Sequence, residues 1–239
     1  MSDDRKSYPV VRSFEARWRA SEIVWLTRTA PVTLLLSIFV CGIPLGGAAA
    51  RTRLLQSSVA PAPLAEASPT LAPFQHVRFC LRYPDECKSE ATGHERIELT
   101  VKTIRLLNLV NRDVNAAIAP ARKSYRANLQ DGWTIAPTTG DCNDYAVTKR
   151  HELLRSRLPS NALRLAVVST DSGDGHLVLV VATTKGDLVM DNLTDAIRLW
   201  QSTDYHWLKI QSARDARFWF EIKLPGSAMS KAYQKVRFG

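Results

Sequence analysis

A single cysteine stands at the start of a predicted helix in the stretch GDCNDYAV, residues 140–147. Asp141 is a residue type that caps helix N-termini, and Cys142 then becomes the first residue of the helix. The partial positive charge of a helix N-terminus stabilises a thiolate, which is the form of cysteine that attacks a carbonyl carbon. Cys142 is therefore a candidate nucleophile, against the alternatives of a small buried hydrophobic residue and of half a disulfide.

A nucleophilic thiol also needs a base and a group that orients the base, and two predicted strands supply them. His176 opens the apolar run HLVLVVAT, and Asp191 lies at the end of the next run, DLVMDN. A Lys-Gly turn separates the two runs, so strand pairing would bring His176 and Asp191 together at the open end of a hairpin. We predict that Cys142 attacks, that His176 transfers the proton and that Asp191 orients His176.

The N-terminal region has the order of an export signal. Residues 1–29 are polar and basic, residues 30–50 carry no charge, and the segment ends in GGAAA, small residues of the kind that a signal peptidase accepts. Its strongest apolar run is short for crossing a hydrocarbon core of ~30 Å. We predict that residues 1–50 are a signal peptide and that the protein is periplasmic. The alternative is an uncleaved segment that anchors it to the inner membrane.

Composition separates a linker from a folded domain. Residues 51–73 are rich in Pro, Ala and Ser and are predicted to be a flexible linker, so the folded domain should cover residues 74–239. The net charge of +9 comes from scattered basic residues without interleaved aromatics. This pattern favours a solvated surface, and we expect no nucleic-acid partner.

Two further cysteines lie close together in FCLRYPDECK. A Tyr-Pro turn between Cys80 and Cys87 can bring their Cα atoms within disulfide range, and export would place them in an oxidising compartment. We predict a Cys80–Cys87 disulfide, with two free thiols as the alternative. Cys142 is then the odd cysteine of the mature chain, as a reactive thiol would be.

The periodicity of apolar residues predicts two helices followed by a run of strands. Helices are expected over residues 96–119 and 142–157, and strands over residues 162–170, 176–183, 187–192, 206–212 and 216–222. This order indicates an α+β fold in which N-terminal helices pack against an antiparallel sheet.

The sequence also resembles the bacterial transglutaminase-like cysteine proteinases, whose LapG-type members are periplasmic proteases that release a large surface adhesin. The resemblance covers roughly residues 76–222 and is carried by FCLRYPDEC, DGWTIAPTTGDCNDYA, GHLVLVV and LVMDN. It implies a papain-like, transglutaminase-core fold and a Cys142–His176–Asp191 triad. It also implies that the backbone N–H of Cys142 and Trp133 donate to an oxyanion, and that an inner-membrane regulatory receptor is a partner.

LapG-type members bind calcium with acidic residues on both sides of the catalytic cysteine. Asp141 matches the first of these, but Asn143 stands where the second carboxylate is expected and brings an oxygen without charge. The resemblance thus implies calcium at Asp141 and Asn143. The alternative is that Asp141 only caps the helix and Asn143 is solvated.

These observations predict a cysteine peptidase that cleaves a periplasmic or cell-surface protein through a thioester intermediate and needs no cofactor for its chemistry. Two alternatives stay open. One is a catalytically weak domain that binds a partner peptide in the same cleft. The other is an acyl transferase, which would use the same triad with an amine as acceptor.

Overall fold

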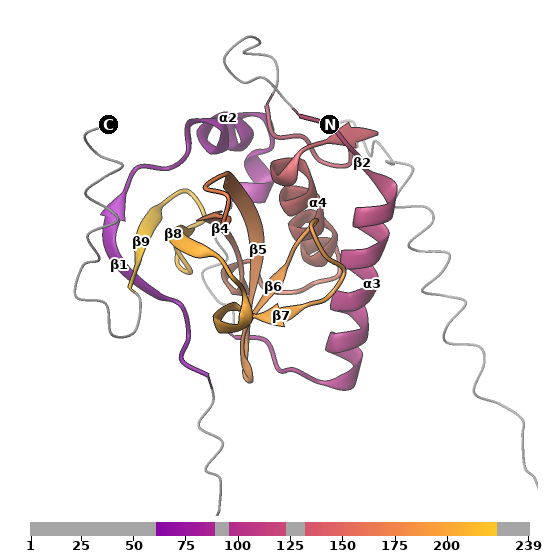
Figure 1. Cartoon of the computed structure of the whole chain (residues 1–239), viewed down its shortest axis with the longest axis vertical. Helices are drawn as coiled ribbons and strands as arrows, with labels where there is room; N and C mark the ends of the chain where they lie inside the picture. The colour runs from indigo at the N-terminus through magenta and orange to yellow at the C-terminus, as the bar shows by residue number, and fades with distance from the viewer. Residues whose placement is uncertain (1–60, 89–95, 123–131, 224–239) are drawn as a thin grey trace, which may run out of the picture.

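The computed structural model describes residues 61–88, 96–122 and 132–223 (Figure 1). The predicted signal peptide lies outside these residues. Among the residues that the structure describes, no helix is long and apolar enough to cross a membrane.

The centre of the fold is a seven-stranded sheet in the order β1-β9-β8-β4-β5-β6-β7. Every neighbouring pair in this sheet is antiparallel, and β4, β5 and β6 follow one another as a meander. The strands are β1 (Ala65–Thr70), β4 (Leu163–Ser169), β5 (Gly175–Thr183), β6 (Gly186–Met190), β7 (Arg198–Leu199), β8 (His206–Gln211) and β9 (Trp219–Lys223). A separate parallel pair joins β2 (Ala119–Pro120) to β3 (Thr139–Gly140).

The helices are α2 (Phe74–Arg82), α3 (Val101–Ala117) and α4 (Cys142–Arg155), with short 3-10 helices η1 (Pro84–Cys87), η2 (Ser160–Ala162) and η3 (Trp200–Ser202). Helices α3 and α4 pack together on one face of the sheet, and α4 lies against β5 (Figure 1). The α+β arrangement predicted from the sequence is confirmed.

Strand β5 is apolar on both faces because both faces are covered. Leu177, Leu179 and Val181 belong to the core beneath the helices, whereas Val178 and Val180 belong to a second core on the opposite face. The second core also contains Leu64, Trp200 and Trp207. The strand is thus held rigidly, and its first residues sit at a fixed place relative to α4.

The folded part begins earlier than the predicted boundary at residue 74. Residues 65–70, inside the segment expected to be a flexible linker, form β1 and pair with β9. The N–H of the buried Leu64 donates to Asp187 Oδ2 at 2.7 Å. The proline content predicts a linker, but Pro69 lies on an edge strand next to a register irregularity, which is where strands tolerate proline.

The first predicted helix, over residues 96–119, is shorter in the structure. Ile97 forms an isolated bridge with Thr183 of β5, so the chain is extended there. Thr100 then caps α3 by accepting a hydrogen bond from the Thr103 N–H. The helical spacing of apolar residues predicts the buried Val110 and Val114 correctly, but Val101 and Ile104 are exposed, and Ile97 is buried where the chain pairs with the sheet.

Candidate active site

Helix α4 starts with a capping box that fixes the position of Cys142. Asp141 Oδ1 accepts a hydrogen bond from the Asn143 N–H at 3.1 Å, and Asp144 Oδ2 accepts one from the Asp141 N–H at 3.0 Å. Asp144 Oδ1 accepts a third from the Thr134 N–H at 2.8 Å. The start of the helix is therefore anchored both to itself and to the preceding loop.

Glycine at position 140 lets the chain pass close to this capping box. A Cβ atom on Gly140 would lie 2.6 Å from Asp144 Oδ2, which is closer than any real contact. Asp144 is completely buried and has no space to move away. Gly140 therefore allows β3 to deliver the chain directly to Asp141 and Cys142.

The hairpin of β5 and β6 places His176 and Asp191. His176 is the second residue of β5, and Asp191 follows the last residue of β6. His176 Nε2 lies 2.8 Å from Asp191 Oδ1, and both side chains are buried. The strand pairing expected from the sequence thus produces the contact between the two residues.

Both oxygens of Asp191 have further partners. Oδ1 also accepts the Leu193 N–H at 3.1 Å, and the Tyr205 hydroxyl donates to Oδ2. Burial raises the pKa of Asp191, but the hydrogen bond and charge of His176, with the donors Tyr205 and Leu193, outweigh it and hold the pKa below its usual value. Asp191 is therefore an ionised carboxylate in a fixed orientation.

Tyr205 is a site residue that the sequence did not reveal. It lies just before β8, and only the pairing of β8 with β4 brings it beside the start of β5. Its ring centroid is 5.6 Å from that of His176. Burial, the hydrogen bond to Asp191 and the charge of Asp191 raise the pKa of Tyr205, so it stays a neutral donor.

His176 lies between Asp191 and Cys142. Asp191 occupies Nε2, which leaves Nδ1 for the thiol. Burial lowers the pKa of His176, but hydrogen bonds and negative charge from Asp191 and Cys142 outweigh it and raise the pKa to about 9. At neutral pH the imidazole is therefore a cation beside the ionised Asp191, the charge state that His176 has in the ion-paired form of a cysteine–histidine site.

Cys142, His176 and Tyr145 face a cleft of about 290 Å³. Cys142 is half-buried and carries a free thiol. The cleft brings the nucleophile and its base to a surface that an extended peptide can reach. Its other lining residues are Pro120, Ala121, Arg122, Gly140, Asp141, Asn192 and Leu193.

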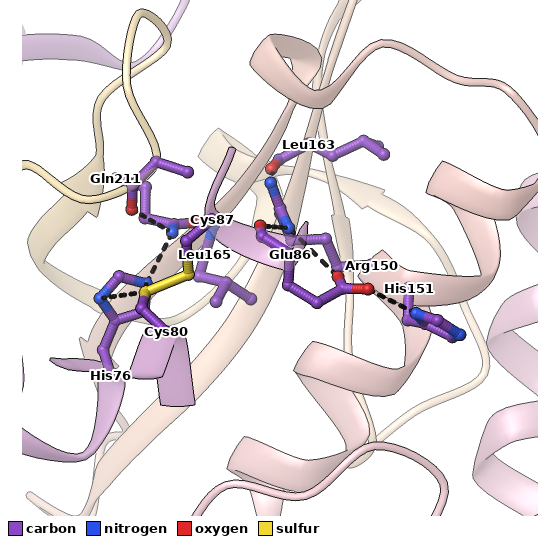
Figure 2. Close-up of polar contacts among 10 residues, drawn as sticks. His76, Cys80, Glu86, Cys87, Arg150, His151, Leu163, Leu165 and Gln211 are labelled. Carbon is purple, nitrogen blue, oxygen red and sulfur yellow. Dashed lines mark hydrogen bonds and ion pairs between the residues drawn. A yellow bond between two sulfur atoms is a disulfide. The ribbon is translucent and has the colours of Figure 1, made fainter. Parts of the chain in front are cut away.

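The far end of α4 is held by a buried ion pair (Figure 2). Arg150 donates from Nε to the Leu163 carbonyl at 2.9 Å and from Nη1 to the backbone carbonyl of Glu86, and its Nη1 lies 3.4 Å from Glu86 Oε2. His151 Nδ1 contacts Glu86 Oε1. Glu86 therefore holds two consecutive residues of the helix that begins at Cys142.

The predicted disulfide between Cys80 and Cys87 is present (Figure 2). It joins α2 to η1, and Cys87 directly follows Glu86. The disulfide therefore fixes the short turn from which Glu86 reaches α4. Cys142 is the free cysteine that remains in the described part of the chain.

The structure does not bring Trp133 into the cleft. Its ring is buried against His76 and Phe79, with centroid distances of 5.7 and 6.1 Å. Trp133 is absent from the residues that line the cleft around Cys142. The backbone N–H of Cys142 belongs to the first turn of α4, where N–H groups have no carbonyl partner within the helix.

The residues around Cys142 do not fit a calcium site as they stand. Asn143 turns its amide group toward Asp141 and donates from Nδ2 to Oδ1 at 3.1 Å. Both oxygens of Asp144 accept backbone N–H groups. Over the described ranges, no cluster of three or more His, Cys, Asp or Glu ligand atoms includes Asp141. Since Ca²⁺ takes six to eight oxygen ligands, we derive no chemical step through calcium.

The family model of the bacterial transglutaminase-like cysteine proteinases (BTLCP) matches residues 66–226. A calcium-bound structure of LapG from Legionella pneumophila is 22% identical, with a TM-score of 0.44, and the match covers 59% of this chain and 82% of that one. An EGTA-treated structure of the same protein is 21% identical, with a TM-score of 0.44, and covers 57% and 75% of the two chains. No curated protein matches the chain. The family match covers well over half of the sequence and includes Cys142, His176 and Asp191. The chain belongs to the bacterial transglutaminase-like cysteine proteinases and is a cysteine peptidase of the transglutaminase-like fold.

Proposed function

We propose that this chain is an exported peptidase that cleaves a peptide bond of a periplasmic or cell-surface protein, with Cys142, His176 and Asp191 as its catalytic triad. The observation that carries the proposal is His176, which faces the cleft with a buried, ionised Asp191 on one ring nitrogen and Cys142 on the other side. A histidine with a purely structural role does not need a free thiol beside it, whereas a catalytic histidine needs a thiol that a helix N-terminus helps to ionise.

The reaction follows from these positions. The Cys142 thiolate adds to the substrate carbonyl carbon, and the negative charge moves to the carbonyl oxygen, where the Cys142 N–H can donate a hydrogen bond. His176 gives its proton to the leaving amine, and the C–N bond breaks to leave a thioester. A water molecule then loses a proton to His176 and attacks the thioester, which releases the acid and restores the thiolate. Asp191 holds the His176 ring throughout.

The predicted export of the chain supports the substrate class. A peptidase that is secreted with residues 1–50 as its signal meets periplasmic and surface proteins, so an adhesin-like surface protein is the substrate we propose. The resemblance seen in the sequence suggests an inner-membrane receptor as the regulator. An uncleaved N-terminal segment would also keep the enzyme beside that membrane.

A peptide library read by mass spectrometry tests the reaction. We expect new termini with a free carboxylate, which only hydrolysis produces. If an added primary amine such as cadaverine appears on the new C-termini at the expense of free acid, the activity is acyl transfer. If peptides bind but no bond is cut, and iodoacetamide alkylates Cys142 no faster than a free thiol, the chain is a binding domain and the peptidase proposal fails.

The rate of hydrolysis is expected to fall as the pH rises through about 9, the pKa of His176. Above this pH the imidazolium loses the proton that the leaving amine needs, so kcat/KM should drop about tenfold per pH unit. Alkylation of Cys142 by iodoacetamide needs only the thiolate and should stay fast at pH 10. Equal pH dependence of the two rates above pH 9 would show that His176 is not the acid.

Calcium affinity should increase when a carboxylate replaces the amide at position 143. Asp141 and Asn143 together bring one negative charge, and Asn143→Glu adds a second beside the same helix start. We expect at least a ~10-fold gain in Ca²⁺ affinity by calorimetry, because ligand charge tunes such sites. The matched control is Asn143→Gln, which lengthens the side chain without charge. Wild-type affinity equal to that of the Glu variant would contradict this expectation.

A further inference from the structure

Lys149 is a buried lysine that the proposed chemistry does not yet use. It lies on α4 two turns after Cys142, on the same face as Tyr145, whose ring centroid is 6.0 Å from Lys149 Nζ. The residue is 0% exposed, and within the described residues its Nζ has no hydrogen-bond partner. Lysine is almost never fully buried unless it is paired, so this position needs an explanation.

The negative groups that act on Lys149 belong to the loop that carries Asp191. Asp191 and Asp195 are the carboxylates whose charges favour its protonated form. On its own helix the ring of Tyr145 lies beside Lys149, and the buried acids of that helix are Asp144 and Glu152. The Asn115 side chain donates to the Asp191 carbonyl at 3.1 Å and to Asp195 Oδ1 at 2.8 Å, and so ties the loop to α3.

The hydrogen bonding around this loop is unbalanced. The side-chain oxygens of Asn111, Asn115 and Asn192 are buried and have no donor in the described structure, while Lys149 Nζ is buried and has no acceptor. Within the described residues, one unpaired donor and three unpaired amide oxygens thus belong to the segments that surround this loop. The lysine is therefore suited to hold the loop through its charge.

The charge of the triad gives this group a role. In the ion-paired form Cys142 and Asp191 are anions and His176 is a cation, so the three together carry one negative charge in a largely buried site. In the thioester with neutral His176, Asp191 alone again leaves one negative charge. Protonated Lys149 brings the sum to zero in both states, which lowers the cost of keeping Asp191 ionised away from water.

We propose that Lys149 is a positioning residue whose buried ammonium group is the counter-charge of Asp191, holding the 191–195 loop so that Asp191 orients His176. This inference rests on the triad proposed above.

The stability of the fold changes with pH in a way that fits this role. Burial lowers the pKa of Lys149 from 10.5 to about 7, although Asp191 and Asp195 raise it. Between about pH 7 and 10.5, Lys149 therefore keeps its proton in the unfolded chain and loses it in the folded chain. The cost of burying Lys149 is fully present below about pH 7 and disappears as the pH rises toward 10.5. Lys149 thus weakens the fold where the triad works, which favours a role in catalysis over a role in stability.

Lys149→Met tests the proposal, since methionine fills similar space without charge. The melting temperature should rise, because the cost of burying the ammonium group exceeds the attraction of Asp191 and Asp195, and kcat should fall about ten- to a hundredfold with KM unchanged. The difference in melting temperature between the variant and wild type should shrink between pH 7 and 10. A purely structural lysine would lower the melting temperature and kcat together when replaced.

Thr148→Val is the matched control on the same helix. Thr148 is buried, and its Oγ1 accepts the Ala136 N–H at 2.9 Å, so its loss should lower the melting temperature and leave kcat unchanged. Unchanged kcat in Lys149→Met would overturn the proposal.

The pKa of the Asp191 carboxyl group, followed by carbon NMR, is a readout that needs no activity. It should rise by about one unit in Lys149→Met, as loss of a nearby opposite charge requires, and stay constant in Thr148→Val. No rise means that Lys149 is not the counter-charge, whether or not wild type cleaves peptides. If the wild-type protein hydrolyses no peptide but the pKa of Asp191 still rises in Lys149→Met, the proposed function fails and the role of Lys149 as counter-charge stands.

Discussion

Cys142→Ala is expected to lower kcat/KM for peptide hydrolysis by ~10⁴-fold or more, because the thiolate that forms the thioester is gone. Cys142 is half-buried, and its thiol contributes little to the core. The melting temperature should therefore stay close to that of wild type. Steady-state kinetics on the peptide found with the library measures the loss, and intact-mass spectrometry should detect a thioester only in proteins that keep the thiol.

Replacement of His176 should lower kcat/KM about as much as replacement of Cys142. His176→Ala removes the group that protonates the leaving amine, and the double variant with Cys142→Ala should be no worse than either single variant, since the residues act as a unit. His206→Ala is the matched control, because His206 is an exposed histidine on β8 outside the cleft. A Cys142→Ala protein that keeps a tenth of the wild-type rate would end the case for a cysteine nucleophile.

Glu86→Gln is expected to destabilise the protein by about 3 kcal/mol, because it leaves the guanidinium group of Arg150 buried without its counter-charge. Arg150 is 2% exposed and Glu86 is 8% exposed, so water cannot replace the lost partner. Urea unfolding, followed by tryptophan fluorescence, gives the free energy of unfolding. Asp85→Asn is the matched control one residue away, since its pair with Lys88 is exposed and should contribute little.

A double variant separates the charge from the packing. Glu86→Leu with Arg150→Met removes both charges, and it should recover much of the stability lost in Glu86→Gln. If Glu86→Gln unfolds at the same urea concentration as wild type, the pair is not what secures α4. Loss of stability equal to that of Asp85→Asn would lead to the same conclusion.

Much of the site follows from local rules of sequence. An aspartate before Cys142 and an acidic residue three positions after the cap predict a capped helix start, and the structure contains the full capping box. The turn at residues 185–186 predicts a hairpin, and its antiparallel register places His176 next to Asp191. These features are set by residues that are close together in the chain, so they can be predicted from a single sequence.

The remaining features depend on contacts between distant segments. Tyr205 reaches Asp191 only because β8 pairs with β4, and no spacing in the sequence reports that pairing. Strand β1 has the composition of a linker, and its partner, β9, comes from the other end of the described chain. Lys149 is completely buried, which its place in the sequence of a helix does not reveal.

The pairing of β1 with β9 also limits when the protein can finish folding. The strand that closes one edge of the sheet comes from residues 65–70, and its partner comes from residues 219–223. Contacts between such distant segments form late, since a long loop must close first. A partly synthesised chain therefore cannot complete its sheet. Until then the chain is incompletely folded and can pass through a secretion channel, as the export proposed from residues 1–50 requires.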